Sequence, residues 1–303
     1  MMNWNQLISA KRFGMEEFHE ERQENRSEFQ RDYDRLIFSA PFRRLQNKTQ
    51  VFPLPGSVFV HNRLTHSLEV ASVGRSLGDD VAKALLERHP ELQDSFLPEI
   101  GSIVSAACLA HDLGNPPFGH SGEKAISTFF SEGKGVRLKE KQPNGEQLSP
   151  MEWEDLIHFE GNANAFRILT HQFEGRRKGG FVLTYTTLAS IVKYPFSSSL
   201  AGKKSKFGFF VSEEESYRKI ATELGLIQLS EQPLKYARHP LVYLVEAADD
   251  ICYQMMDIED AHKLKIITTD ETKELLMAFF SEDRQSRLRS TFQIVNDINE
   301  QIA

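Results

Sequence analysis

The chain is organised around residues 111–123, whose sequence is HDLGNPPFGHSGE. The stretch opens with an imidazole beside a carboxylate, His111 and Asp112, where the apolar segment 103–110 ends. Gly114 and two consecutive prolines then stop the helix, because proline lacks a backbone donor and clashes with the preceding turn. Two adjacent metal-ligand side chains at a fixed helix end indicate a metal site more readily than ordinary core packing.

A second imidazole–carboxylate pair follows the prolines. His120 and Glu123 are three residues apart, so they meet on one turn of a helix. Beside a metal, a histidine oriented by a carboxylate is a common proton donor or acceptor. The alternative is an ordinary surface pair between Gly119 and Gly122, and the residues alone leave both interpretations open.

Apolar residues recur at helical spacing through most of the chain, and no long run alternates between apolar and polar residues. We therefore predict an all-α fold. The expected helices run at residues 65–90, 101–113, 124–130, 162–174 and 187–193, with others opening after 212 and at 240.

Two of these helices have expected start signals. Thr65 is the predicted N-cap of the first. Ser212 and Glu215 are predicted to form a capping box.

The composition is that of a globular protein. The chain has 303 residues, of which 40% are apolar and 26% charged, so residues 1–303 are expected to form one domain with a catalytic core at about 40–260. A net charge of −7 argues against a protein that mainly coats nucleic acid. Because this charge repels anions, an anionic ligand needs local cations or a metal.

Cys108 and Cys252 lie in apolar segments and are expected to be reduced. With no signal-peptide pattern and no bilayer-length apolar stretch, the protein is expected to be soluble and cytoplasmic.

Two more candidate ligands lie far from the central doublet. His66 is on the first long helix and Asp249 on the last, so three packed helices can bring them to His111 and Asp112. Imidazole with carboxylate suits Mn²⁺, Mg²⁺, Fe²⁺ or Zn²⁺. The alternative is that His66 is a core histidine and Asp249 an ion-pair partner. A purely structural role is less plausible for Asp112, because a carboxylate among apolar neighbours is costly to bury without a cation or hydrogen-bond donors.

Polar residues near these ligands are candidate contacts for a sugar and an anion. Tyr253 and Asp257 follow Asp249 at i+4 and i+8, on one slowly drifting helix face. Arg63 lies three residues before His66 and supplies a cation. The alternative for each is a solvated surface position.

Lys193 and Tyr194 form a similar candidate at a predicted helix end. They directly precede Pro195. A lysine is needed if the ligand is a polyphosphate, since the net charge does not favour an anion.

Four longer strings resemble one known family. They are NRLTHSLEV at 62–70, HDLGNPPFGH at 111–120, FEGNA at 159–163 and EAADDICY at 246–253. Together they resemble the deoxyguanosine triphosphate triphosphohydrolases of the HD phosphohydrolase superfamily. The resemblance implies an all-α HD-domain bundle with peripheral helices and loop insertions. It also implies hydrolysis of a dNTP to a deoxynucleoside and inorganic tripolyphosphate.

The resemblance also implies roles for individual residues. The metal ligands would be His66, His111, Asp112 and Asp249. The catalytic pair would be His120 and Glu123. Contacts to sugar or phosphates would come from Gln50, Arg63, Asn162, Lys193, Tyr194, Tyr253 and Asp257. One divalent ion is expected, Mn²⁺ or Mg²⁺ before Fe²⁺, Co²⁺ or Zn²⁺, and relatives commonly assemble as hexamers built from dimers.

One position separates branches of the family. Many broader dNTP triphosphohydrolases have histidine where this chain has Asn115, and the asparagine resembles the bacterial dGTPase branch. This favours dGTP as the substrate. Family members usually continue through further helices after the position of Ala303, so the C-terminal helices are expected to be incomplete unless this is a short member.

The expected reaction is attack of a metal-activated water on the α-phosphorus, with His120 protonating the departing 5′-oxygen. The nearest alternative is another HD reaction, on a phosphodiester or a nucleoside monophosphate. A further alternative is a regulator that binds nucleotide or DNA without turnover. The complete set of ligands and acid–base residues argues against such a regulator. Single-stranded DNA or a dNTP is a candidate effector, and the basic loop at 203–206 is the candidate contact for single-stranded DNA.

Overall fold

The computed structural model describes residues 2–17, 26–48, 61–143, 145–175, 178–202 and 205–302. It divides into two compact units, the described residues of Met1–Gly56 with His61–Tyr253 and those of Gln254–Ala303. The expectation of a single domain over residues 1–303 stays a prediction.

The described residues are mainly helical, which confirms the all-α prediction. The α-helices are α1 (Trp4–Leu7), α2 (Glu28–Ile37), α3 (Ala40–Arg44), α4 (Arg63–Arg88), α5 (Ile100–Ala110), α6 (His120–Ser131), α7 (Pro150–Ile157), α8 (Gly161–Thr170), α9 (Tyr185–Ile191), α10 (Glu214–Glu223), α11 (Val242–Lys263), α12 (Thr269–Met277) and α13 (Glu282–Ile302). Short 3-10 helices are η1 (Leu45–Asn47), η2 (Pro90–Leu92), η3 (Leu97–Glu99), η4 (Lys134–Lys139), η5 (Ser198–Leu200) and η7 (Val211–Glu213). Strands β1 (Gln228–Ser230) and β2 (Lys235–Tyr236) pair antiparallel.

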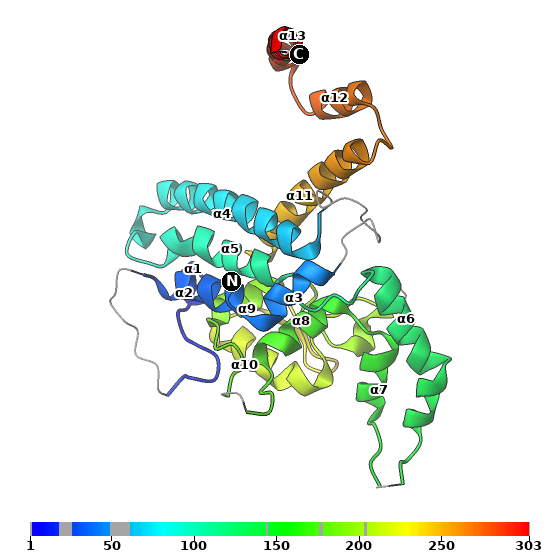
Figure 1. Ribbon diagram of the computed structural model, residues 1–303. Helices are drawn as coiled ribbons and strands as arrows, with labels where there is room; N and C mark the ends of the chain where they lie inside the picture. The colour runs from blue at the N-terminus through cyan, green and yellow to red at the C-terminus, as the bar shows by residue number, and fades with distance from the viewer. Residues whose placement is uncertain are drawn as a thin grey trace. The chain divides into compact units, whose positions relative to one another are not determined.

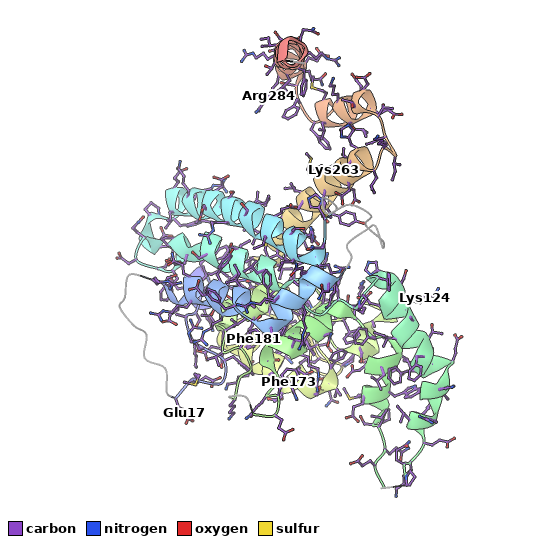
Figure 2. All side chains as sticks on the ribbon, in the orientation of Figure 1. Glu17, Lys124, Phe173, Phe181, Lys263 and Arg284 are labelled. Atoms are coloured by element: carbon purple, nitrogen blue, oxygen red, sulfur yellow. The ribbon has the colours of Figure 1, made fainter. Side chains whose placement is uncertain are left out.

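The core of the first unit is built around α5, which lies alongside α4 (Figure 1). Nearly every side chain of α5 is buried. Small residues let the two helices approach closely. A Cβ added at Gly78 would lie 2.7 Å from the Cα of Gly101, and one at Gly74 would lie 2.5 Å from Cys108 Sγ. Close antiparallel packing brings the first turn of α4 to the last turn of α5. Phe181, labelled in Figure 2, packs against the same core.

The start of α4 differs from the prediction by one turn. Asn62, not Thr65, is the N-cap, and its side chain accepts hydrogen bonds from the backbone N–H groups of Leu64 and Thr65. The Thr65 hydroxyl in turn accepts from the N–H of Asn62, which completes a capping box. Arg63 and His66 therefore share the first turn of α4.

The capping box predicted at Ser212 is wrong. Helix α10 begins at Glu214 without a side-chain cap. The hydroxyl of Ser212 instead accepts from Arg167 at 2.8 Å and donates to Glu213 at 2.8 Å. A tertiary partner has replaced the local cap.

In the second unit, α12 does begin with a capping box, formed by Thr268 and Glu271. Within the described residues, none of the helices combines the length and apolar character needed to cross a lipid bilayer.

Stability is expected to depend on pH through His239, which is completely buried. Its Nε2 donates to the carbonyl of Leu7 at 3.0 Å, and its Nδ1 accepts from the N–H of Leu241 at 3.2 Å. Burial lowers the pKa of His239 to about 4. The unfolded chain therefore binds a proton below its ordinary pKa of 6.5, whereas the folded chain stays neutral until about pH 4. The free energy of unfolding therefore falls as the pH falls from about 6.5 to about 4.

Urea unfolding at pH 7.5 and pH 5 tests this expectation. The wild type should lose about 2 kcal/mol more free energy of unfolding between these pH values than His239→Gln does. An equal loss in both proteins would contradict it.

Candidate metal centre and its pocket

The four predicted ligands come together from three helices. His66 lies on α4, His111 and Asp112 lie at the end of α5, and Asp249 lies on α11. Ligand atoms of His66, His111 and Asp112 are all within 4.8 Å of one another. Oδ1 of Asp249 is 3.0 Å from Nε2 of His66 and 3.5 Å from Nε2 of His111.

His111 has the surroundings of a metal ligand. Its Nδ1 donates to the carbonyl of Cys108 at 2.6 Å, which fixes the tautomer. The lone pair on Nε2 is therefore available to a metal. That Nε2 is buried and makes no hydrogen bond with the described residues, yet it lies 3.5–3.6 Å from carboxylate oxygens of Asp249 and Asp112. A lone pair facing two carboxylates needs a cation between them. The residues therefore fit a divalent ion.

The charges of the cluster support the same conclusion. Burial acts to lower the pKa of His111, but the carboxylates of Asp112 and Asp249 outweigh it and raise this pKa to about 9. Burial acts to raise the pKa of both carboxyls, but the neighbouring imidazoles, with Arg63 for Asp112, hold both pKa values below the usual range. In the absence of a metal, a proton thus supplies the positive charge that the carboxylates require.

Asp112 is further fixed by two donors. Nη1 of Arg63 donates to its Oδ2 at 2.5 Å, and the side-chain amide of Asn115 donates to its Oδ1. These contacts explain how a carboxylate with 5% exposure is tolerated among apolar neighbours. Asn115 therefore contacts a predicted ligand directly.

The turn after Asp112 is held by contacts to its backbone. Nζ of Lys48 donates to the carbonyl of Asn115 at 2.7 Å, and the side-chain amide of Asn164 donates to the carbonyl of Gly114 at 2.8 Å. Gly114 packs against the start of α8. The turn therefore sets α6 relative to α5 and α8.

Gly114 should tolerate no side chain. A Cβ there would lie 2.0 Å from the carbonyl oxygen of Gly161 and 2.2 Å from the nitrogen of Ala165, and backbone atoms cannot rotate away. We expect Gly114→Ala to lower the free energy of unfolding by about 3 kcal/mol. Gly175→Ala is the control. Gly175 has a φ of +73° and open space, so only backbone strain of about 1 kcal/mol is expected. Equal losses in urea unfolding would contradict the steric explanation.

His120 and Glu123, predicted as a pair, are in contact. Nδ1 of His120 lies 2.8 Å from Oε2 of Glu123, on the first turn of α6. Oε1 of Glu123 accepts from the N–H of Gly161 at 2.8 Å, so the carboxylate is anchored to α8. The side chain of His120 is 85% exposed and is accessible to a ligand. Lys124, the next residue of α6 after Glu123, is labelled in Figure 2.

A cavity of about 370 Å³ joins the ligand cluster to the His120–Glu123 pair. This volume suits a small-molecule ligand. The predicted substrate contacts that line it are Arg63, Asn162, Lys193, Tyr194 and Tyr253. Lys193 pairs there with Glu246 at 2.9 Å, and Arg238 pairs with the same carboxylate at 2.8 Å.

The remaining predictions have mixed outcomes. Gln50 lies outside the described residues, and Asp257 belongs to the second unit. Lys203 and Lys204 also lie outside the described residues, so contact of the basic loop with single-stranded DNA stays a prediction. Lys206, interpreted from the sequence as part of that surface loop, lines the cavity instead.

Glu160 and Glu246 also line the cavity, and neither was assigned a role from the sequence. Both lie inside the strings that carry the family resemblance, which is the signal that could have singled them out.

Comparison with known proteins agrees with the geometry. The HD domain family matches residues 63–179. A deoxyguanosinetriphosphate triphosphohydrolase-like protein of Pseudomonas aeruginosa is 46% identical over 290 residues, which cover 93% of this chain and 62% of the relative. A protein of the same description from Synechocystis is 47% identical over 268 residues, 86% of this chain and 60% of the relative.

A deoxyguanosinetriphosphate triphosphohydrolase of Yersinia enterocolitica is 36% identical over 306 aligned residues, 89% of this chain and 57% of the relative. The chain thus spans about three fifths of the length of these relatives. The family resemblance seen in the sequence is confirmed: this is an HD-domain protein, related over most of its length to deoxyguanosinetriphosphate triphosphohydrolases and the proteins described as like them.

Proposed function

We propose that the protein hydrolyses deoxynucleoside triphosphates, dGTP first among them, to a deoxynucleoside and inorganic tripolyphosphate. The observation that carries this proposal is a single cavity that joins a His–Asp metal cluster to the His120–Glu123 pair and to basic side chains. The relatives are described as deoxyguanosinetriphosphate triphosphohydrolases or as proteins like them, and Asn115 resembles the dGTPase branch. Assembly into a hexamer and control by an effector belong to the same proposal.

One divalent ion, Mn²⁺ or Mg²⁺ before Fe²⁺, Co²⁺ or Zn²⁺, would be held by His66, His111, Asp112 and Asp249. When bound, such an ion supplies charge neutralisation at a phosphate and activates water as a nucleophile. Because the liganding nitrogens must be unprotonated, His111 would have to give up its proton to hold an ion there.

The protein's own groups supply the remaining chemistry. His120, held by Glu123, protonates the 5′-oxygen that leaves the α-phosphorus. Arg63 and Lys193 carry the charge of the tripolyphosphate, which the net charge of −7 would otherwise repel. These three groups act on the phosphate chain.

Other residues hold the rest of the substrate. Tyr253 and Asp257 contact the deoxyribose, and Gln50, Asn162 and Tyr194 are further contacts to the sugar or the phosphates. Of these, Asn162, Tyr194 and Tyr253 line the cavity.

The proposal is tested with purified protein, Mn²⁺ or Mg²⁺, and each dNTP in turn, with the products resolved by ion chromatography. Tripolyphosphate and deoxynucleoside in equal amounts are expected, with dGTP turned over fastest. Orthophosphate from a nucleoside monophosphate, or products from a cyclic or linear dinucleotide, would instead indicate another HD reaction. Nucleotide binding without turnover would indicate a regulator.

A further inference from the structure

Glu160 is a completely buried carboxylate at the N-terminus of α8. Its Oε2 accepts hydrogen bonds from the backbone N–H groups of Asn162 at 2.5 Å and Ala163 at 3.2 Å, so one oxygen suffices to cap the helix. The second oxygen has other partners.

Oε1 of Glu160 contacts two side chains that line the cavity. It accepts from Nδ2 of Asn162 at 2.8 Å and from Nζ of Lys206 at 2.8 Å. An N-cap has no need of an ammonium partner, and Lys206 comes from a part of the chain more than forty residues away. The contact therefore fixes Lys206 in the cavity.

Lys206 lies between two carboxylates. Its Nζ is 3.7 Å from Oε2 of Glu123, the oxygen that also bonds His120. Burial acts to lower the pKa of Lys206, but Glu160 and Glu123 outweigh it and raise the pKa above its usual value. Lys206 is thus an ammonium, and a line of contacts runs from Glu160 through Lys206 and Glu123 to His120.

We infer that Glu160 is a positioning residue for the proposed reaction. Through Lys206 it holds Oε2 of Glu123 against His120, and it caps the helix turn whose Gly161 N–H holds the other oxygen of Glu123. Besides the imidazole, Oε1 of Glu123 then has a backbone donor, and Oε2 has an ammonium 3.7 Å away. The inference rests on the proposed function for its kinetic consequence, but the anchoring of Lys206 can be measured without turnover.

The kinetic test uses Glu160→Gln, Lys206→Met and the double variant. Each single variant should lower kcat by about 10- to 100-fold, because positioning accounts for part of the rate that a proton-transferring group contributes. KM should stay within about threefold of the wild-type value. The double variant should be no slower than the slower single variant, because the residues act as a unit.

Glu213→Gln is the matched control. Glu213 is also a buried carboxylate bonded to a basic residue, Arg167 at 2.5 Å, but it does not line the cavity. Its loss should lower stability and leave kcat unchanged. A comparable fall in kcat in Glu213→Gln, or an unchanged kcat in Glu160→Gln, would overturn the inference.

The test that needs no turnover is competitive acetylation with acetic anhydride, quantified at Lys206 by mass spectrometry. Loss of the Glu160 charge should raise the reactivity of Lys206 by about tenfold, because one pKa unit changes the unprotonated fraction of an amine tenfold. Glu213→Gln should leave it unchanged. Equal reactivity in the wild type and Glu160→Gln would overturn the anchoring.

The two tests also separate this inference from the proposed function. If the wild type hydrolyses no dNTP, the proposed function fails, whereas acetylation still decides whether Glu160 anchors Lys206. If Glu160→Gln does not fold, Lys206→Met decides the kinetic part, because it leaves the cap of α8 intact. An unchanged kcat in Lys206→Met would then overturn the inference.

Discussion

Asp112→Ala is expected to remove bound metal and hydrolytic activity together. Asp112 contributes one of the clustered ligand atoms, and its carboxylate is one of the two that face Nε2 of His111. Without it, Arg63 loses its buried partner and stands as an uncompensated cation beside the site. Both effects oppose the binding of a divalent ion.

The measurement is Mn²⁺ binding by calorimetry, with dGTP turnover measured on the same preparation. Turnover should fall to background, a loss of at least about 10⁴-fold, because the reaction then lacks its Lewis acid. Asp155→Ala is the control, since Asp155 has the same 5% exposure but accepts from the N–H of Val211 outside the cavity. It should bind Mn²⁺ normally. Retention of both metal and turnover in Asp112→Ala would refute the metal assignment.

His120→Gln should lower kcat by about 10²–10⁴-fold, the usual contribution of a general acid, while KM changes little. Glutamine keeps a polar group of similar size but cannot deliver a proton to the leaving oxygen. Since His120 is not among the clustered metal ligands, Mn²⁺ binding should persist. Steady-state kinetics and calorimetry on one preparation separate this outcome from loss of the metal.

His158→Gln is the matched control for His120→Gln. His158 also pairs with a glutamate, at the C-terminal end of α7, where its Nδ1 lies 3.3 Å from Oε2 of Glu154. It does not line the cavity. Its kcat should equal that of the wild type. A fall of less than tenfold in His120→Gln would assign proton transfer to another group.

The sequence predicted the fold class, and which residues come together at the candidate site, better than it predicted the individual contacts of these residues. Asp112 could be singled out because a carboxylate among apolar residues requires a compensating charge, and the structure supplies Arg63 and the imidazoles. His120 and Glu123 could be paired because their spacing is local. That Asp249 meets His66 depends on tertiary packing across 183 residues, which helical periodicity cannot specify.

The errors have the same origin. Ser212 has the local signature of a cap, but Arg167 arrives from a distant helix and takes its hydroxyl. The residues around Lys206 are typical of a solvated basic loop, but Nζ of Lys206 bonds the buried carboxylate of Glu160, and the side chain therefore lines the cavity. In both positions a long-range partner outweighs a local preference of about 1 kcal/mol.

The most direct test of the central claim is hydrolysis of dGTP with Mn²⁺ in H₂¹⁸O, followed by mass spectrometry of the products. Attack on the α-phosphorus predicts intact tripolyphosphate that carries one ¹⁸O, and deoxyguanosine that carries none. Label in the 5′-hydroxyl of deoxyguanosine, release of pyrophosphate or orthophosphate in place of tripolyphosphate, or no turnover of any dNTP would contradict it.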